Sequence, residues 1–423
     1  MDVHSRHSHA QGSELRLETA PGSSVTLTLK EGEAEVFGTS LTLGEAISIS
    51  DQKLAVFSWQ GAKILVQGEP EIAYTSDDTP MQSYINVHDT LEARRRAASE
   101  RAAAAAAGLA TEGPRVMLVG PTDAGKSSLS KILLNYAVRC GWTPTFVDLD
   151  LGQGSITIPG CIGATPVEGP LDIEEGYPAD APLVYYAAST SGAESVDLYR
   201  QLVESMAGVL GRRSALSAKA AASGALVNTM GWIDGDGYAL LKHAAGALRC
   251  DVILVLGSDR LHSQLVADMP PSVSVVKLAK SGGVVTRSRE ARAEARKARV
   301  EEYFYGPHRT LVPASQTVLL EDVEIYRVGG APRAPSSALP IGAASVADPL
   351  KLVRVTNPQE LLYSVLAVSH APSADLLLSA SVAGFVYVQD ADPAKGTLTV
   401  LAPRPGALPS TRLLAGNFKI YLD

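Results

Sequence analysis

The sequence predicts a central α/β domain, with a mostly parallel sheet wrapped by helices, between two small β domains. Apolar strand patterns alternate with helical patterns from residue 115 to about residue 310. Short runs of alternating polar and apolar residues precede and follow that region. A glycine-rich loop joins the first apolar strand to a helical pattern. Alternating strands and helices are typical of a parallel sheet, whereas short alternating runs are typical of β-sandwiches.

The order of these patterns sets the expected boundaries. We expect a disordered polar tail over residues 1–13, an N-terminal β-sandwich over 14–100, a central domain over 101–329 and a C-terminal β domain over 330–423. The C-terminal domain begins with a linker over 330–347 that is rich in Pro, Ala and Ser. The strands expected in the central domain are 116–119, 145–149, 183–187, 225–227, 252–256 and 273–278.

The loop at residues 120–127 reads G-P-T-D-A-G-K-S and fits the phosphate-binding pattern G-x-x-x-x-G-K-[ST]. Its glycines allow backbone N–H groups to surround phosphate oxygens, and the helix that follows presents its N-terminus to the anion. Lys126 is expected to reach the β- and γ-phosphates, and the Ser127 hydroxyl is expected to hold Mg²⁺. The loop residues expected around a nucleotide are Gly120, Thr122, Asp123, Ala124, Gly125, Lys126, Ser127 and Ser128.

A P-loop alone does not separate GTPases, ATPase motors and kinases. The [NT]-K-x-D motif of small GTPases does not follow the strand at 252–256, which disfavours a GTPase. The second strand ends in Asp148 and Asp150, whose carboxylates point the same way at the carboxyl end of the strand. One of them can orient Mg²⁺-bound water and the other can accept a hydroxyl proton, as the base does in phosphoryl transfer. The alternative is that one of them only caps a turn.

Two further features lie downstream of these carboxylates. Trp232 follows Gly231 directly after a strand, where an indole can stack on a base or a ribose; the alternative is a core or rim residue. Arginines at 289, 292, 296 and 299 share one helical face after a flexible S-G-G joint at 281–283. Next to a P-loop, this segment favours a mobile lid that neutralises phosphate charge, rather than a solvated basic helix.

Composition limits the classes of function. The formal net charge is −8, whereas proteins that coat nucleic acid are usually basic, so any contact with nucleic acid must be local. No apolar run reaches the length of a membrane span, so we expect no membrane association.

Together and in this order, the motifs resemble one family, the eukaryotic RNA 5′-hydroxyl kinase that is the polyribonucleotide kinase subunit of pre-mRNA cleavage factor II. The similarity runs from about residue 14 to the C-terminus. The stretches that carry it are A-E-V-F-G-T at 34–39, the loop at 120–127, L-D-L-G-Q-G-S at 149–155, G-W at 231–232, K-S-G-G-V-V at 280–285 and E-Y-F-Y-G at 302–306. The chain departs from the family pattern at Ala124, where Val is frequent, and at Asp148, where Glu is usual.

The resemblance implies transfer of the γ-phosphate of ATP to the 5′-hydroxyl end of RNA, with Mg²⁺ as the metal. Asp150 then becomes the general base, and the arginines form the lid. The implied site residues are the catalytic Lys126, Asp150, Arg287 and Arg292, Gln153 near the RNA or the metal, Trp232 against the terminal nucleotide, and Glu14 and Lys53 at the base of ATP.

The resemblance also implies partners and a location. The expected partners are RNA with a 5′-hydroxyl end and other subunits of the pre-mRNA cleavage and polyadenylation machinery, in the nucleus. The tRNA splicing endonuclease is a further partner that such a kinase would serve. Some members of the family keep ATP but have lost kinase activity and act as scaffolds. Here the lysine, the base, the tryptophan and the lid arginines are all present, which favours an active enzyme over the scaffold alternative.

Overall fold

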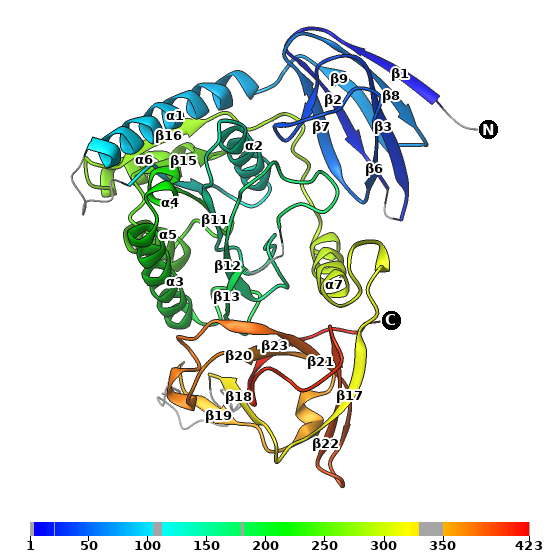
Figure 1. The fold of residues 1–423 in the computed structure, drawn as a ribbon, viewed down its shortest axis with the longest axis vertical. Helices are drawn as coiled ribbons and strands as arrows, with labels where there is room; N and C mark the ends of the chain where they lie inside the picture. The colour runs from blue at the N-terminus through cyan, green and yellow to red at the C-terminus, as the bar shows by residue number, and fades with distance from the viewer. Residues whose placement is uncertain (1–3, 21, 105–111, 179–181, 330–349, 423) are drawn as a thin grey trace, which may run out of the picture.

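The computed structural model describes residues 4–20, 22–104, 112–178, 182–329 and 350–422. Three domains follow one another along the chain, and the two β domains lie at opposite ends of the central domain (Figure 1). This arrangement confirms the predicted fold class. The expected linker at 330–347 lies outside the described residues.

The N-terminal domain is a sandwich of two antiparallel sheets. Inward-facing residues of the two sheets fill one core, for example Leu15 and Leu17 against Val25 and Leu27. One sheet has the order β1 (His4–His9), β8 (Ala62–Gln67), β3 (Ser24–Gly32) and β6 (Ala46–Ser50). The other has the order β5 (Thr39–Ser40), β4 (Glu35–Val36), β7 (Lys53–Ser58), β2 (Ser13–Glu18) and β9 (Ile72–Ser76).

The prediction of a disordered tail over residues 1–13 is wrong for residues 4–9. These residues form β1, which pairs antiparallel with β8 from His4 opposite Gln67 to His9 opposite Ala62. The segment has no apolar alternation, so its sequence does not indicate a strand. It pairs because the edge of β8 offers unsatisfied backbone donors and acceptors.

The central sheet has seven strands and confirms the predicted, mostly parallel arrangement. Five of them, β11, β14, β10, β15 and β16, run parallel, and β12 lies antiparallel between β11 and β13. The sequence did not indicate β12. The order is β13 (Leu183–Tyr186), β12 (Cys161–Pro166), β11 (Thr145–Asp148), β14 (Ala225–Asn228), β10 (Arg115–Val119), β15 (Val252–Leu256) and β16 (Ser274–Leu278).

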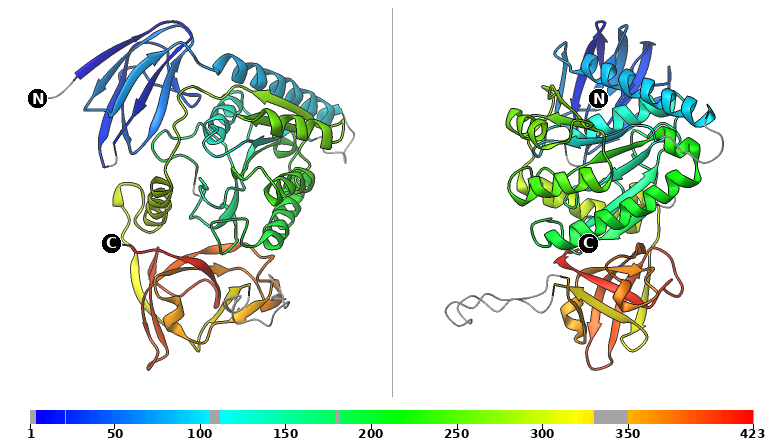
Figure 2. Two further views of the ribbon diagram at one scale, coloured as in Figure 1. Left: turned by 180° about the vertical axis from the view of Figure 1, so that it is seen from behind. Right: turned by 90° about the vertical axis from the view of Figure 1, so that its left-hand side faces the viewer.

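Helices cover both faces of this sheet, which Figure 2 shows from two sides. Val116 and Leu118 of β10 pack with residues of α1 and α2, whereas Met117 and Val119 pack into the opposite core with α3, α5 and α6. Burial on both faces explains why the strands read as continuous apolar runs. The helices are α1 (Met81–Ala104), α2 (Lys126–Arg139), α3 (Val196–Leu216), α4 (Ala218–Ser223), α5 (Asp236–Ala247), α6 (Asp259–Asp268) and α7 (Arg289–Tyr305).

The C-terminal domain is built on one seven-stranded mixed sheet with its own core. It begins earlier than residue 330, because β17 and β18 belong to it. The domain boundary expected at residue 100 also differs from the structure. It falls inside α1, and this helix packs on α2 and α4 of the central domain. The order of the sheet is β17 (Ala314–Leu319), β22 (Thr397–Ala402), β21 (Val382–Asp392), β20 (Ser364–Ser369), β23 (Arg412–Lys419), β18 (Glu324–Val328) and β19 (Leu352–Arg354).

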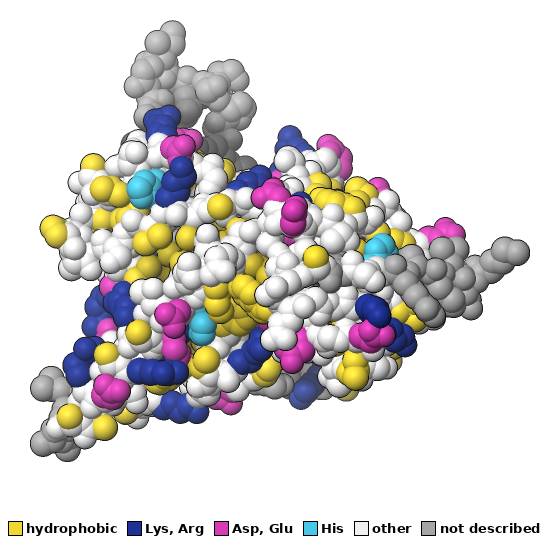
Figure 3. Space-filling model, turned by 90° about the horizontal axis from the view of Figure 1, so that it is seen from above, with side chains coloured by type: hydrophobic (Ala, Val, Ile, Leu, Met, Phe, Trp, Pro, Cys, Tyr) yellow, Lys and Arg dark blue, Asp and Glu magenta, His cyan; other side chains and the backbone are white. Residues whose placement is uncertain are grey.

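The face of the molecule over the N-terminal domain and α1 carries no field of a single charge sign. Figure 3 shows acidic and basic side chains interspersed there. Among the described helices, none combines the length and the apolar character that crossing a bilayer requires.

A buried carboxylate fastens the N-terminal domain to α2, the helix that follows the phosphate loop. Glu35 is 6% exposed and accepts hydrogen bonds from the hydroxyl of Tyr136 and from Nη1 of Arg139, the latter at 2.9 Å. Asn135 adds a 2.8 Å bond to the carbonyl of Phe37. The position of α2 therefore depends on the turn at 35–38.

We expect Glu35→Ala to lower the midpoint of thermal unfolding by about 4 °C, since leaving the buried Tyr136 hydroxyl without its acceptor costs about 2 kcal/mol. Glu31→Ala is the matched control. It removes an ion pair with Lys63 whose side chains are 63% and 58% exposed, so its effect should stay within about 1 °C. Differential scanning calorimetry would measure both, and equal shifts would contradict the structural role of Glu35.

Candidate functional site

The phosphate loop lies between β10 and α2, at the carboxyl edge of the central sheet. A Cβ at Gly120 would lie 2.4 Å from the carbonyl oxygen of Leu256 on β15, so only glycine fits there. Gly125 precedes α2 with a φ of 90° and makes no side-chain cap, and the first turn carries no acidic residue. Ser127 and Ser128 of that turn are exposed. The open N–H groups and the dipole of α2 therefore form an anion site.

Lys126 lies inside this loop with 7% of its surface exposed. Its Nζ donates to the carbonyl oxygens of Gly120 at 2.8 Å and Pro121 at 2.9 Å. An ammonium has three donors, so these bonds leave one for a phosphate oxygen. Burial lowers the pKa of Lys126 to about 8, against the opposing effect of nearby carboxylates, of which Asp150 is the strongest.

Asp148 is the last residue of β11 and is 2% exposed. It accepts three hydrogen bonds, from the backbone of Asp150 at 3.1 Å, from Nδ2 of Asn228 at 3.1 Å and from the backbone of Ser155 at 2.7 Å. Burial and the charge of Asp150 raise its pKa to about 6, although the three bonds oppose the shift. Both oxygens are committed to the turn, so Asp148 mainly orders the loop that carries Asp150.

Asp150 uses only one of its two carboxylate oxygens within the protein. Oδ1 caps the turn by accepting from the backbone of Gly152 at 2.9 Å and of Gln153 at 3.0 Å. Among the described residues, no hydrogen bond reaches Oδ2. Burial raises the pKa of Asp150, while the bond from Gln153 and the charge of Lys126 hold it down. Asp150 can therefore cap the turn through Oδ1 and still accept a proton through Oδ2.

The loop after β14 lies directly against the phosphate loop. A Cβ at Gly231 would lie 2.5 Å from the backbone nitrogen of Thr122 and 2.7 Å from its Cα. Trp232 therefore stands beside the phosphate loop, half-buried, with Gly237 packed against its indole ring. The sequence placed Trp232 at a strand end, but it did not indicate this contact with Thr122.

The basic segment closes onto the phosphate loop. Asp123 accepts hydrogen bonds from the backbone of Arg287 at 3.0 Å, from its Nε at 3.4 Å and from Nη2 of Arg292 at 2.6 Å. Gln153 donates to the carbonyl of Arg292 at 3.3 Å, which links the Asp150 turn to the same segment. The structure thus brings Lys126, Asp150, Gln153, Arg287 and Arg292 into one region.

The N-terminal domain reaches this region through Arg16, a residue that sequence reasoning missed. Arg16 bonds Oε1 of Glu14 at 2.6 Å, and Thr79 donates to Oε2 of Glu14 at 2.7 Å. A Cβ at Gly283 would lie 2.8 Å from Cδ of Arg16, so this side chain lies against the joint of the basic segment. Glu14 and Arg16 are two residues apart on β2, so their side chains lie on the same face of the strand. That spacing is the sequence signal that would have indicated the ion pair.

Lys53 does not join Glu14. It pairs with Glu18 at the other end of the β2–β7 ladder, where Glu18 lies opposite Lys53 and Glu14 lies opposite Phe57. Four residues along a strand span roughly 14 Å. A shared contact of Lys53 and Glu14 with one base is therefore not supported.

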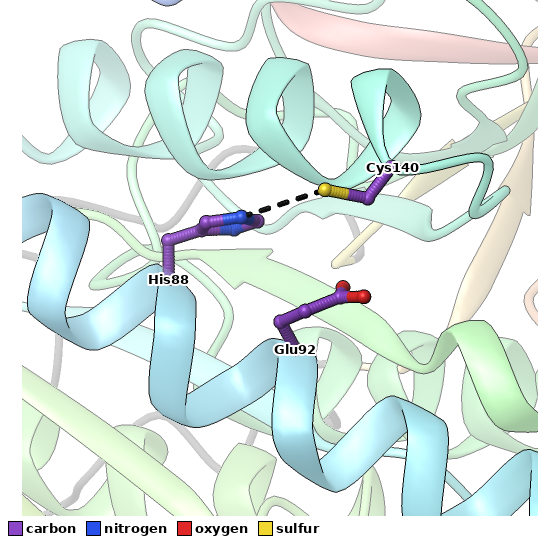
Figure 4. Close-up of side chains that lie close together, drawn as sticks. All are labelled: His88, Glu92 and Cys140. Atoms are coloured by element: carbon purple, nitrogen blue, oxygen red, sulfur yellow. Dashed lines mark hydrogen bonds between the residues drawn. The ribbon is translucent and has the colours of Figure 1, made fainter.

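A separate cluster carries ligand-type atoms but does not suit a metal. His88 and Glu92 of α1 and Cys140 at the end of α2 bring one such atom each within 4.8 Å of the others (Figure 4). Glu92 already accepts from the indole of Trp142 at 2.6 Å and the guanidinium of Arg96 at 2.7 Å. Burial raises the pKa of the Cys140 thiol, whereas a metal needs the thiolate. We interpret the cluster as a polar junction between the two helices.

Three family descriptions match the chain in sequence order. They are the N-terminal beta-sandwich domain of polyadenylation factor over residues 10–98, the P-loop of mRNA cleavage and polyadenylation factor CLP1 over 120–306, and pre-mRNA cleavage complex II protein Clp1 over 311–422.

Relatives match almost the whole chain. It is 47% identical over 409 residues to "Protein CLP1 homolog" of Arabidopsis thaliana, which covers 96% of this chain and 91% of that protein. It is 44% identical over 412 residues to "Polyribonucleotide 5′-hydroxyl-kinase Clp1" of Homo sapiens, which covers 97% of this chain and 95% of that protein.

Two solved structures share the fold at 23% sequence identity. One is wild-type Clp1p in complex with Pcf11p, with a TM-score of 0.83 over 99% of this chain and 98% of that one. The other concerns the Pcf11p–Clp1p interface and ATP loss in a point mutant, with a TM-score of 0.84 over 99% of both chains.

We expect Gly231→Ala to weaken ATP binding about tenfold or more. The added methyl group would displace Thr122 of the phosphate loop, and overpacking of this kind costs about 1–3 kcal/mol. Gly246→Ala in α5 is the control, because a Cβ there meets nothing within 4 Å. Isothermal titration calorimetry with ATP would measure both; unchanged affinity of Gly231→Ala would contradict this account of the contact.

Proposed function

Since this chain belongs to the Clp1 family of mRNA cleavage and polyadenylation factors, we propose that it is an ATP-dependent polyribonucleotide 5′-hydroxyl kinase. The observation that carries the proposal is one region that holds the P-loop ammonium of Lys126, the Oδ2 of Asp150, to which no described residue donates, and the two arginines bound to Asp123. A cation at the phosphates, a base for a hydroxyl and a cationic lid are the parts that phosphoryl transfer requires.

The proposed reaction is an in-line displacement. The 5′-hydroxyl oxygen of RNA bonds to the γ-phosphorus of ATP while the bond from that phosphorus to the β–γ bridging oxygen breaks. The hydroxyl proton passes to Oδ2 of Asp150, and ADP leaves with the electron pair. Lys126, the N-terminus of α2 and the lid arginines offset negative charge on the transferring group.

The residues present suit Mg²⁺, which prefers oxygen ligands. The exposed Ser127 hydroxyl lies at the start of α2, and Oδ1 of Asn228, beside Asp148, is buried with no hydrogen-bond partner among the described residues. When bound to ATP, Mg²⁺ would offset phosphate charge. In this proposal Ser127 ligates the metal, and Asp148 keeps the neighbouring turn in place.

In this proposal, residues around the phosphate loop would bind both the RNA end and ATP. Trp232, beside Thr122, offers an indole on which the terminal base can stack. Gln153 lies between the Asp150 turn and the lid, where it can contact the RNA end or the metal. We assign Glu14, which is paired with Arg16 beside the lid joint, to the base of ATP, while Lys53 has no part in this assignment.

We place this activity in nuclear pre-mRNA 3′-end cleavage and polyadenylation, where a partner of the Pcf11 type would bind the chain. RNA ends for the tRNA splicing endonuclease are a second setting for the same chemistry. A silent, ATP-bound scaffold is the alternative, because the two similar structures concern a complex of Clp1p with Pcf11p and its ATP.

Asp150→Asn should lower kcat by about 10²–10⁴-fold, because it removes the proton acceptor, and Lys126→Ala should abolish labelling. The assay uses labelled ATP, Mg²⁺ and a short 5′-hydroxyl RNA, with the DNA of the same sequence as a second arm. Asp172→Asn is the control, since Asp172 caps a similar turn at Glu174 and Glu175 away from the site and should leave the rate unchanged. ATP retained by wild type without any turnover would favour the scaffold instead.

The pH profile of kcat/KM should be bell-shaped. The base must be ionised, and burial raises the pKa of Asp150, so the rate should fall with falling pH earlier than for an ordinary aspartate. Lys126 must be protonated, and its pKa of about 8 predicts a second fall as the pH rises past that value. Steady-state rates over the range would show both limbs; a flat alkaline limb would contradict the role of the buried ammonium.

A further inference from the structure

Asp123 is the one acidic residue of the phosphate loop, and its carboxylate accepts hydrogen bonds from Arg287 and Arg292. The residue has a left-handed φ of 55°, and its side chain is 5% exposed. Aspartate tolerates this conformation better than most residues, yet it still costs energy. A carboxylate beside phosphates would also repel them. The backbone strain and the repulsion of phosphate both need a compensating interaction. The hydrogen bonds that Asp123 accepts come from Arg287 and Arg292 of the lid.

The two oxygens of Asp123 are shared by two lid residues. Oδ1 accepts from Nε of Arg287, and Oδ2 accepts from the backbone nitrogen of Arg287 and from Nη2 of Arg292. Arg287 precedes α7, and Arg292 lies in its first turn, where Ser288 caps the helix. Asp123 therefore fixes both the entry of the chain into α7 and the first turn of the helix.

The buried Nε of Arg292 is an unused donor, because it has no hydrogen-bond partner among the described residues. The carbonyl of Arg292 is held from the other side by Nε2 of Gln153 at 3.3 Å. A buried, unpaired N–H on a cation is costly unless a ligand completes it, and a phosphate oxygen is a strong acceptor for a guanidinium. Asp123 and Gln153 thus hold Arg292 with a free donor.

We propose that Asp123 is a positioning residue, which latches the lid onto the phosphate loop and presents the free Nε of Arg292 to the transferring phosphoryl group. This inference rests on the proposed kinase function. The trio of Asp123, Arg287 and Arg292 carries a net charge of one positive unit, so it still attracts phosphate. Without the carboxylate both cations remain, but the lid loses its attachment to the loop.

The test is Asp123→Asn, with Asp123→Glu as the conservative variant. Asparagine tolerates the left-handed backbone and keeps the shape of the side chain, so the loop should still bind ATP. Asp259→Asn is the matched control, because Asp259 pairs with Lys277 at the start of α6 with 79% of its side chain exposed. Circular dichroism would establish that each variant is folded.

Two readouts separate positioning from general stability. Limited trypsin digestion with mass spectrometry follows cleavage after Arg287 and Arg292, which should be several-fold faster in Asp123→Asn than in wild type or Asp259→Asn. Kinase kinetics should show kcat reduced about 10- to 100-fold, as for a misplaced catalytic group, with KM for ATP within about twofold. Asp123→Glu should recover part of both properties.

Unchanged cleavage of the lid in Asp123→Asn would overturn the latch, whatever the kinase rate. Faster cleavage with an unchanged kcat would overturn the presentation of Arg292. The digestion needs no turnover, so an inactive wild-type protein would count against the kinase proposal while faster cleavage would still support the latch.

Discussion

The burial of one cation, the ammonium of Lys126, is the constraint on which the site depends. The positive end of the α2 dipole disfavours a charge there, and burial removes its water. Two loop carbonyls and the carboxylates at the end of β11 compensate for this cost. Those carboxylates are themselves buried close together. Burial raises the pKa of both, while the surrounding N–H donors, and for Asp150 also the charge of Lys126, oppose that shift. The phosphate loop and the Asp148–Asp150 turn consequently stabilise each other.

The flanking domains extend this mutual dependence. The N-terminal domain binds α2 through Glu35, and its Arg16 side chain packs against Gly283 at the start of the lid. The C-terminal domain holds the other end of the lid helix, where the hydroxyl of Tyr303 accepts a bond from the backbone of Phe385 at 3.0 Å. Residues of the central and C-terminal domains also share one hydrophobic core. Both β domains therefore contact segments that adjoin the phosphate loop.

Local patterns indicated most of the elements but not all of them. Strands β10, β11, β14 and β15 were visible as apolar runs because both their faces are buried. Strand β16 was also visible, although most of its residues are exposed or half-buried. The sequence did not indicate β1, because this polar edge strand is held by backbone hydrogen bonds to β8. It also did not indicate β12, which pairs antiparallel with β11. For Asp150, the sequence left the turn cap and the base as alternatives. The structure shows that the cap uses Oδ1 alone, which no spacing rule can resolve.

The sequence by itself determined the fold class, the phosphate loop with its lysine and the group of side chains at the strand ends, because these follow from periodicity and short-range backbone chemistry. Only the tertiary structure decided which charges meet. Lys53 pairs with Glu18 across β2 and β7, and Asp123 bonds Arg287 and Arg292 across more than 160 positions of chain. Such pairings depend on how strands register and domains pack, since electrostatic energy falls with distance in space and not with separation in sequence.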